Sequence, residues 1–255
     1  MRGPPPVTTA AVWFDTLDST SAEARRRAEA GEAGPLWIAA RRQTAGRGRR
    51  GRAWETPEGN LAATWLGTTD KPPAEAAQVS FVAALAVADL ACAYVPESLI
   101  RLKWPNDPLL AGRKLGGVLV ESGARPDGRL WLACGVGVNL AHAPVAAERP
   151  ATTLAEHLSV EHPAPPSPEP ALEQLAAAFE RWMKRWAAQG FEPIRAAWTE
   201  RAAGLGQPCE ARLGSETVQG VAEALEADGA LRLRLPEGGV RRITAGDVFF
   251  GGSLR

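Results

Sequence analysis

Short apolar runs alternate with longer segments whose apolar residues recur every three or four positions. The short runs have the length and composition of strands, and the longer segments have the periodicity of helices. Strands are expected over residues 11–17, 36–40, 60–66, 99–104, 109–110, 114–121 and 130–138. Helices are expected from residue 20 to Gly31 and over residues 73–94, 153–158, 172–186 and 194–203.

Two of these helices carry side chains that could serve structure or function. Thr20 and Glu23 have the spacing of a capping box, which predicts Thr20 as the helix cap. The alternative is that the hydroxyl groups and amides at this helix start bind a polar ligand. The aromatic residues of segment 172–186 follow the helical period, so we interpret them as core residues and not as a cofactor site.

The pattern changes after Gly204-Leu205-Gly206. Short strands are expected over residues 208–213, 217–225, 230–235 and 240–244, and turn residues such as Asp228-Gly229 separate them. Several short strands within about fifty residues predict a small β-barrel. We therefore divide the chain into residues 1–205 and residues 206–255.

The balance of charge bears on the class of partner. The chain has 255 residues with 29 Lys and Arg against 29 Asp and Glu, so its formal net charge is zero. A protein whose main partner is DNA or RNA usually carries a basic surplus. Here the basic residues are concentrated in one segment, which favours a site for a small anion.

The cysteines and the start of the chain show no sign of a metal site, a disulfide framework or a signal peptide. Cys92, Cys134 and Cys209 lack metal-ligand spacing and are odd in number, so neither a zinc site nor a disulfide framework is expected. The start of the chain lacks the apolar core of a signal peptide, and no membrane span is expected. We expect a protein of the cytoplasm.

Residues 43–54, which we call the arginine loop, concentrate arginine and glycine between two strands. Arginine presents a rigid fork of donors to carboxylate or phosphate, and glycine lets a backbone approach a ligand closely. The loop therefore predicts a lid that holds an anion. A solvated basic loop and a nucleic-acid segment are the alternatives. The GxGxxG match inside the loop lacks the strand-to-helix unit of a nicotinamide site.

Other polar residues fall at strand ends or turns, where ligand groups are commonly placed. They are Lys103, Asn106, Asp107, Lys114 and Asn139. Cations on loops without an evident nucleophile suit the attack of a carboxylate on the α-phosphate of a nucleotide, because two anions must be neutralised before they meet. The product of this attack, an acyl-adenylate, is labile in water and needs a lid that excludes water. Mg²⁺ on the phosphates would need few protein ligands.

Five segments, in order along the chain, resemble the biotin protein ligase family. They are Asp18-Ser19-Thr20, residues 43–54, residues 103–107 (KWPND), residues 113–121 (RKLGGVLVE) and residues 135–139 (GVGVN). Residues 245–248 also resemble the end of that family's small C-terminal domain. The arginine loop together with KWPND is highly specific, and the resemblance covers nearly the whole chain.

The resemblance implies an α+β fold, in which a mixed sheet flanked by helices, as in class II aminoacyl-tRNA synthetases and lipoate ligases, precedes an SH3-like barrel. It implies ATP as cofactor, Mg²⁺ without a fixed protein site, and the carrier domain of acetyl-CoA carboxylase or a related carboxylase as partner. Implied biotin contacts are Ser19, Thr20, Ser21, Gln43, Arg47, Gly48, Arg49, Lys114, Gly116 and Gly117. Implied ATP contacts are Arg49, Arg52, Trp54, Lys103, Asn106, Asp107 and Asn139. Lys114, Arg49 and Lys103 are the implied catalytic residues, and Trp54 is expected to cover the adenylate.

Two departures and two rivals accompany this interpretation. Ser21 stands where many relatives have Asn, and the first strand begins near residue 11, which leaves no room for a winged-helix domain. Binding to DNA is therefore not expected. One rival is a lipoate ligase or acyltransferase on the same fold, although such enzymes lack the arginine loop and KWPND. The other is a nucleic-acid-binding regulator that uses the arginine loop.

Overall fold

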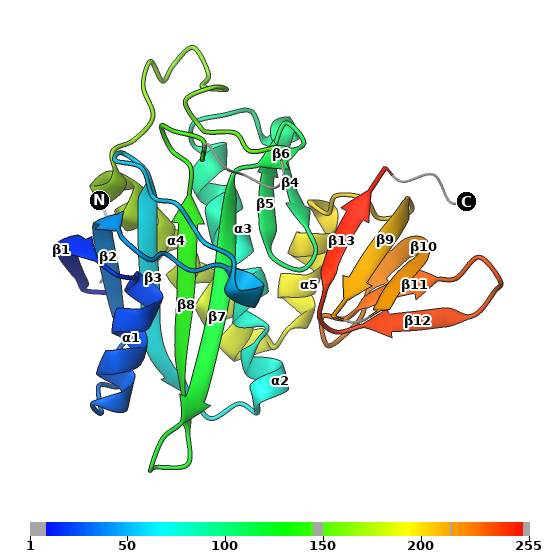
Figure 1. Cartoon of the computed structure of the whole chain (residues 1–255), viewed down its shortest axis with the longest axis horizontal. Coiled ribbons are helices and arrows are strands. Elements are labelled where there is room, and N and C mark those ends of the chain that lie inside the picture. The colour runs from blue at the N-terminus through cyan, green and yellow to red at the C-terminus, as the bar shows by residue number, and fades with distance from the viewer. Residues whose placement is uncertain (1–8, 145–149, 215, 252–255) are drawn as a thin grey trace, which may run out of the picture.

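The computed structural model describes residues 9–144, 150–214 and 216–251. A five-stranded sheet forms the centre of the larger part, in the order β1-β2-β3-β8-β7 (Figure 1). Its strands are β1 Ala11–Leu17, β2 Leu36–Gln43, β3 Leu61–Thr69, β8 Leu130–Val138 and β7 Gly116–Ala124. β1 and β2 are parallel and the other neighbours are antiparallel, so the expected mixed sheet is confirmed.

Helices cover both faces of this sheet because successive strand residues point to opposite sides. Trp37 of β2 faces α4 (Pro168–Gln189), where its ring lies 5.4 Å from the Phe179 ring. Its neighbour Ile38 packs on the other face with Ala24 of α1 (Thr20–Glu29). The aromatic residues of the segment expected over 172–186 are thus core residues, as expected.

The helix expected over residues 73–94 is divided into α2 (Pro73–Ala76) and α3 (Val79–Cys92). Between them the amides of Gln78 and Phe81 bond three residues back, to Glu75 and Gln78, instead of four. Hydrophobic periodicity does not report this change in hydrogen bonding. The stretch Pro73–Cys92 is long and apolar enough to cross a membrane, but most of it is buried inside the protein. We interpret it as the core segment beneath the sheet.

Three short strands follow α3 and bring polar residues toward the sheet. They are β4 Ile100–Lys103, β5 Asp107–Leu110 and β6 Arg113–Lys114, which form an antiparallel sheet of their own. The strand expected over 114–121 is interrupted at Leu115, whose amide donates to the carbonyl of Pro108. The chain thereby turns from β6 into β7.

The helix expected over residues 153–158 was wrong, because these residues form a turn. The amides of Leu154 and Ala155 donate to the carbonyls of Asn139 and Leu140, and the amide of Glu156 donates to the Thr153 side chain. Within the segment the His157 amide donates to Leu154 O, three residues back, so it closes a turn and not an α-helical turn. The last helix of the larger part is α5 (Glu192–Glu200).

The C-terminal part is an antiparallel sheet in the order β12-β11-β10-β9-β13. Its strands are β9 Pro208–Leu213, β10 Glu216–Leu225, β11 Leu231–Arg234, β12 Val240–Ile243 and β13 Asp247–Phe250. Across the described residues β12 and β13 are the two edge strands and do not pair with each other, so the expected barrel is not closed. The indole of Trp104 donates to Gly229 O at 3.0 Å and joins this sheet to the larger part. The division at residues 205 and 206 stays a prediction.

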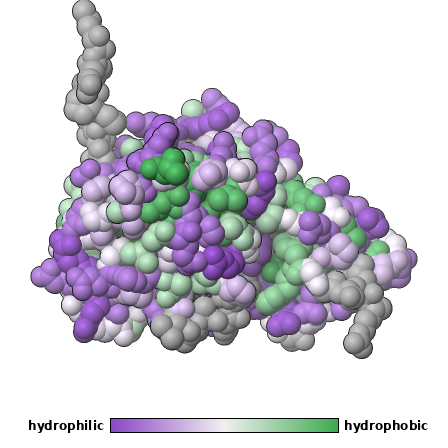
Figure 2. All heavy atoms as spheres, turned by 90° about the horizontal axis from the view of Figure 1, so that it is seen from above, coloured by the Kyte–Doolittle hydropathy of each residue, from purple (hydrophilic) through white to green (hydrophobic). Residues whose placement is uncertain are grey.

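Seen from above, hydrophilic side chains cover much of the molecule, and apolar patches lie between them (Figure 2). The large apolar side chains exposed in the described structure are Val160 and Val240. Neither belongs to the cavity described below.

Candidate active site

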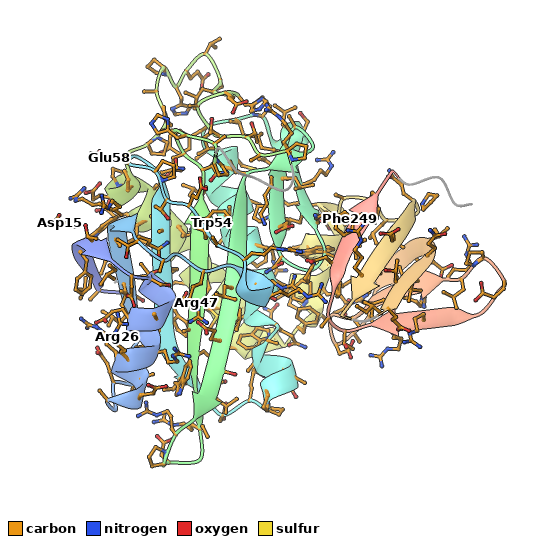
Figure 3. All side chains as sticks on the ribbon, in the orientation of Figure 1. Asp15, Arg26, Arg47, Trp54, Glu58 and Phe249 are labelled. Atoms are coloured by element: carbon orange, nitrogen blue, oxygen red, sulfur yellow. The ribbon has the colours of Figure 1, made fainter. Side chains whose placement is uncertain are left out.

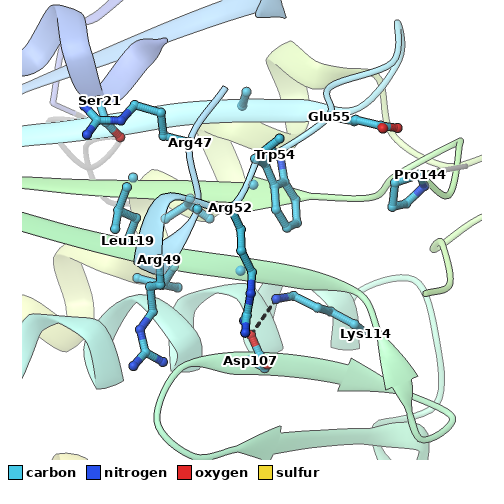
Figure 4. A pocket seen from close by; sticks show the side chains of 18 of the residues that line it. Ser21, Arg47, Arg49, Arg52, Trp54, Glu55, Asp107, Lys114, Leu119 and Pro144 are labelled. Carbon is cyan, nitrogen blue, oxygen red and sulfur yellow. Dashed lines mark ion pairs between the residues drawn. The ribbon is translucent and has the colours of Figure 1, made fainter. Parts of the chain in front are cut away.

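A cavity of about 380 Å³ lies between the central sheet and the arginine loop (Figure 4). The loop carries the short 3₁₀ helix η1 (Arg49–Gly51), and it closes on itself through hydrogen bonds from Gly48 N to Arg52 O and from Trp54 N to Gly46 O. Arg47 and Trp54 both lie over the sheet (Figure 3). The loop therefore forms the roof of the cavity, and β7 and β8 form its floor.

The floor is made of glycine where the roof comes closest. A Cβ atom on Gly137 of β8 would lie 2.3 Å from the ring of Trp54, and one on Gly135 would lie 2.5 Å from the Ser21 hydroxyl. Both distances are below van der Waals contact, so neither position has room for a side chain. Gly137 thus lets the Trp54 ring approach the sheet, and Gly135 leaves room for Ser21.

One end of the cavity is lined by hydroxyl and amide groups. The Thr20 amide donates to Gln43 Oε1 at 2.8 Å, and Gln43 Nε2 donates to Thr56 Oγ1 at 3.0 Å. Buried Thr64 donates to Thr20 Oγ1 at 2.8 Å and lies 3.3 Å from Ser21 Oγ. These contacts fix the rotamers of the groups that face the cavity.

The capping box expected for this helix was wrong. Ser19, not Thr20, is the N-cap, since its side chain accepts from the Ala22 amide at 3.4 Å. Glu23 turns outward and pairs with Arg26 and Arg27 at 2.9 Å each. Because Ser19 performs the capping, Thr20 is available to the cavity.

Two lysines meet one carboxylate at the other end. Lys114 Nζ lies 2.7 Å from Asp107 Oδ1, and Lys103 Nζ lies 3.1 Å from Asp107 Oδ2. Burial raises the pKa of Asp107, but the attraction of Lys114 and Lys103 outweighs this and holds the pKa below its ordinary value. Asp107 is therefore an ionised anchor for both ammonium groups. Lys114 also lies 5.7 Å from the centre of the Trp54 ring.

Arg49 enters the cavity from the loop. It donates to Asn106 Oδ1 at 3.1 Å and to Gly246 O at 3.0 Å. The Asn106 amide nitrogen donates in turn to Val118 O, so both ends of that amide are used within the protein. Burial lowers the pKa of Arg49, and the nearby carboxylates of Asp247 and Asp107 oppose that effect.

The C-terminal sheet supplies a carboxylate to the same loop. Asp247, at the start of β13, accepts from Arg52 at 2.8 Å and from Arg50 at 3.2 Å. Only 6% of its surface is exposed. A buried carboxylate surrounded by guanidinium groups links the arginine loop to the C-terminal sheet across almost 200 residues of sequence.

Arg47 points away from the lysines. Its guanidinium lies on the side of the cavity near Ser21 and Leu119 (Figure 4), where it lies 3.9 Å from Glu121 Oε1. The resemblance implies that Arg47 contacts biotin. Here its stem forms a wall at the hydroxyl-lined end.

Most of the residues expected in the site line this single cavity. Thr20, Ser21, Gln43, Arg47, Gly48, Arg49, Arg52, Trp54, Asn106, Asp107, Lys114, Gly117 and Asn139 all do so. Ser19, Lys103 and Gly116 do not: Ser19 caps its helix, Lys103 reaches Asp107 from behind, and Gly116 packs against the Gly137 carbonyl.

Several residues of the site were given no role from the sequence. They are Thr56, Thr64, Leu119, Gly135, Gly137 and Asp247. The glycines stand in a matched motif, so their alternation on β8 was a usable signal. Thr64 carried none. Asp247 stands in the matched residues 245–248, but its contact with the arginine loop joins distant segments, which a local motif does not report.

The arrangement can bind a ligand with a polar head, a flat or apolar middle and an anionic tail. The head would meet the hydroxyl-lined end, and the tail would meet Lys114 and the loop arginines. Among the described residues no group of three or more His, Cys, Asp or Glu side chains could hold a metal ion. The cations that line the cavity can stabilise negative charge that develops on a bound ligand.

The sequence of this chain was compared with protein families and with known proteins. Residues 13–139 match the Biotin/lipoate A/B protein ligase family, and residues 204–251 match the Biotin protein ligase C terminal domain. The chain is 46% identical to the biotin--[acetyl-CoA-carboxylase] ligase of Paracoccus denitrificans over 239 residues, which covers 92% of this chain and 98% of that one. It is 33% identical to the ligase of that name from Mycobacterium tuberculosis, which covers 90% and 85%.

The fold has a solved counterpart as well. The biotin protein ligase from Aquifex aeolicus in complex with biotin and ATP superimposes with a TM-score of 0.74 at 25% identity, over 96% of this chain and 99% of that one. Fold and site together define a protein of the biotin and lipoate ligase class. Given its full-length similarity to the Paracoccus ligase, the chain belongs to the biotin protein ligase family.

Proposed function

We propose that this chain is an ATP-dependent biotin protein ligase. In the first step a carboxylate oxygen of biotin attacks the α-phosphorus of ATP, which forms biotinyl-5′-AMP and releases pyrophosphate. In the second step a lysine amine of a carrier domain attacks the acyl carbon, which forms an amide and releases AMP. The observation that carries the proposal is the cavity that joins a hydroxyl-lined end to a cluster of cations, in a chain 46% identical to a named biotin ligase.

The bicyclic head of biotin would lie at the hydroxyl-lined end. Ser21, Thr20 and Gln43 offer donors and acceptors there for the ureido group, and Thr64 and Thr56 hold them in position. Leu119 and the glycine floor would contact the apolar rings, under Trp54. Arg47 would close this end with its stem and not serve the phosphate.

The carboxylate of biotin and the α-phosphate would meet near Lys114 and Arg49. Lys114 is held by Asp107 and Arg49 by Asn106, so neither cation needs to reorganise far when negative charge develops. Lys103 and Asn106 would then act through these partners and not by touching the nucleotide. Arg52 and Asn139 line the same cavity and would contact the nucleotide directly.

Asp107 and Asp247, the buried carboxylates of the cavity, do not fit a dedicated Mg²⁺ site. Asp107 is engaged by two lysines, and Asp247 is engaged by the loop arginines. Mg²⁺ prefers to keep several waters and to bind through substrate phosphates. We propose that it arrives with ATP, and no step here depends on a protein-bound ion.

The partner of the second step would be the biotin carrier domain of acetyl-CoA carboxylase or a related carboxylase. We propose that the two proteins meet in the cytoplasm. A direct test is to incubate the purified chain with biotin and ATP and to measure biotinyl-5′-AMP and pyrophosphate. Formation of both in equal amounts is expected, and formation of neither would refute the first step.

A further inference from the structure

A segment that follows the site in sequence, residues 150–157, binds the main chain of two cavity residues. The Lys114 amide donates to Pro150 O at 2.9 Å, and the Thr152 amide donates to Lys114 O at 3.0 Å. The Leu154 amide donates to Asn139 O at 3.0 Å. The segment thus helps to fix Lys114 of β6 and Asn139, which follows β8, relative to each other, together with the bond from the Asn139 amide to Leu115 O.

The same segment orients the Asn139 side chain. Its Nδ2 donates to Thr152 O at 3.1 Å, so Oδ1 is the end of the amide that could meet a ligand. Oδ1 is buried, and it has no hydrogen-bond partner among the described residues. Buried polar atoms are normally paired, so an unpaired acceptor beside a cavity points to a donor on a ligand. The position of the Thr152 carbonyl therefore decides which end of the amide a ligand meets.

A polar cluster behind the segment holds Thr152 in place. Thr152 Oγ1 lies 2.9 Å from His157 Nε2, and Arg113 Nη2 lies 3.1 Å from the same nitrogen. A guanidinium group can only donate, so Nε2 must accept and the ring proton lies on Nδ1. Arg113 also bonds Glu156 at 2.7 Å and Ala151 O at 3.4 Å. His157 thereby joins the threonine to an arginine that is anchored twice more.

We propose that Arg113 and His157 are positioning residues for nucleotide binding, acting through Thr152 on Asn139. The inference rests on the proposed function, since it takes the ligand at Asn139 to be ATP. Neither Arg113 nor His157 lines the cavity. Their loss is therefore felt at the nucleotide end, while the hydroxyl-lined end, built on α1, β2 and β3, keeps its own contacts.

The test compares ligand binding by calorimetry in His157→Ala, His157→Gln and Arg113→Met. His157→Ala and Arg113→Met are expected to weaken ATP binding at least fivefold and to change biotin affinity less than twofold. His157→Gln is expected to recover most of the loss, because its amide oxygen can accept from both donors. Arg129→Met is the matched control, since Arg129 forms a 2.7 Å pair with Asp127 on an exposed turn.

Thermal melting of each variant separates positioning from general stability. Unchanged ATP affinity in His157→Ala, or equal losses for ATP and biotin that follow the loss in Tm, would overturn the proposal. If His157→Ala does not fold, Arg113→Met and His157→Gln still decide it. Calorimetry needs no turnover, so a wild-type chain that binds ATP but makes no biotinyl-AMP would count against the proposed function alone.

Discussion

The ammonium group of Lys114 lies 2.7 Å from a carboxylate oxygen of Asp107, so the cation proposed to meet the biotin carboxylate is held by a buried anion. Asp107 is only 8% exposed and is shared with Lys103. This pairing fixes positive charge at the point where two anions must approach. The positive charges that would stabilise the transition state are therefore in position before a substrate binds.

Lys114→Ala is expected to slow biotinyl-AMP formation by about 10²–10³-fold, the size typical for loss of one preorganised charge at a transition state. Asp107 keeps Lys103, so we expect the fold to survive. Single-turnover formation of the adenylate measures the effect, and circular dichroism checks the fold. Lys184→Ala, an exposed lysine on α4, serves as control. A Lys114→Ala rate near that of wild type would remove Lys114 from the mechanism.

Asp107→Asn is expected to destabilise the protein in a pH-dependent way. The pKa of Asp107 is lowered in the folded protein, so its carboxylate contributes stability above the ordinary Asp pKa of about 3.9 and loses it as pH falls further. The difference in free energy of unfolding between wild type and Asp107→Asn should be constant from about pH 5 to 8 and shrink below about pH 4. Urea denaturation measures it. A difference that grows in acid would contradict the assignment.

Asp247→Asn is expected to loosen the arginine loop from the C-terminal sheet. Arg50 and Arg52 lose their shared anion, while Arg49 keeps its bond to Gly246 O. We expect the KM for ATP to rise about tenfold, which corresponds to about 1.4 kcal/mol, and trypsin to cleave the loop faster. Asp228→Asn removes an exposed pair with Arg242 in the same sheet and is the control. Equal behaviour of the two variants would show that Asp247 does not order the loop.

Arg49→Gly is expected to release biotinyl-AMP into solution. Arg49 reaches into the cavity from the roof, so its loss removes a cation from the intermediate. Biotin on lysines of an added bystander protein reports the leak. Arg50→Gly should leak less, because Arg50 is not among the cavity-lining residues. Bystander labelling no higher for Arg49→Gly than for Arg50→Gly would speak against a retaining role.

The parts of the fold that sequence could predict are those with strong local patterns. The strands that begin at Ala11 and Leu130 and the helix around Phe179 carry clear periodicity, and the structure has them. The C-terminal sheet was expected to close into a barrel, but it is open. Closure depends on whether β12 and β13 pair, and the pattern of either strand does not report this. The cap at Ser19 was missed because Thr20 and Glu23 have the same spacing as a true capping box.

The same distinction applies to the site. The arginine loop, Asn106 and Lys114 could be predicted because each stands in a dense local motif. Their partners could not. Asp247 comes from the far end of the chain, and Thr64 is one of several threonines in strands. Which arginine meets which anion is decided by packing, and for that reason Arg47 lies beside Glu121 and not beside the lysines.

The central claim is that this chain attaches biotin to a carrier lysine. The most direct measurement incubates the purified protein with ATP, a biotin carrier domain and equal concentrations of biotin and lipoate, and then determines the mass of the carrier. We predict that the carrier gains one biotinyl group on a single lysine and no lipoyl group, and that the gain requires ATP. A carrier that gains lipoate alone, or gains nothing while the chain binds DNA tightly, would contradict this account.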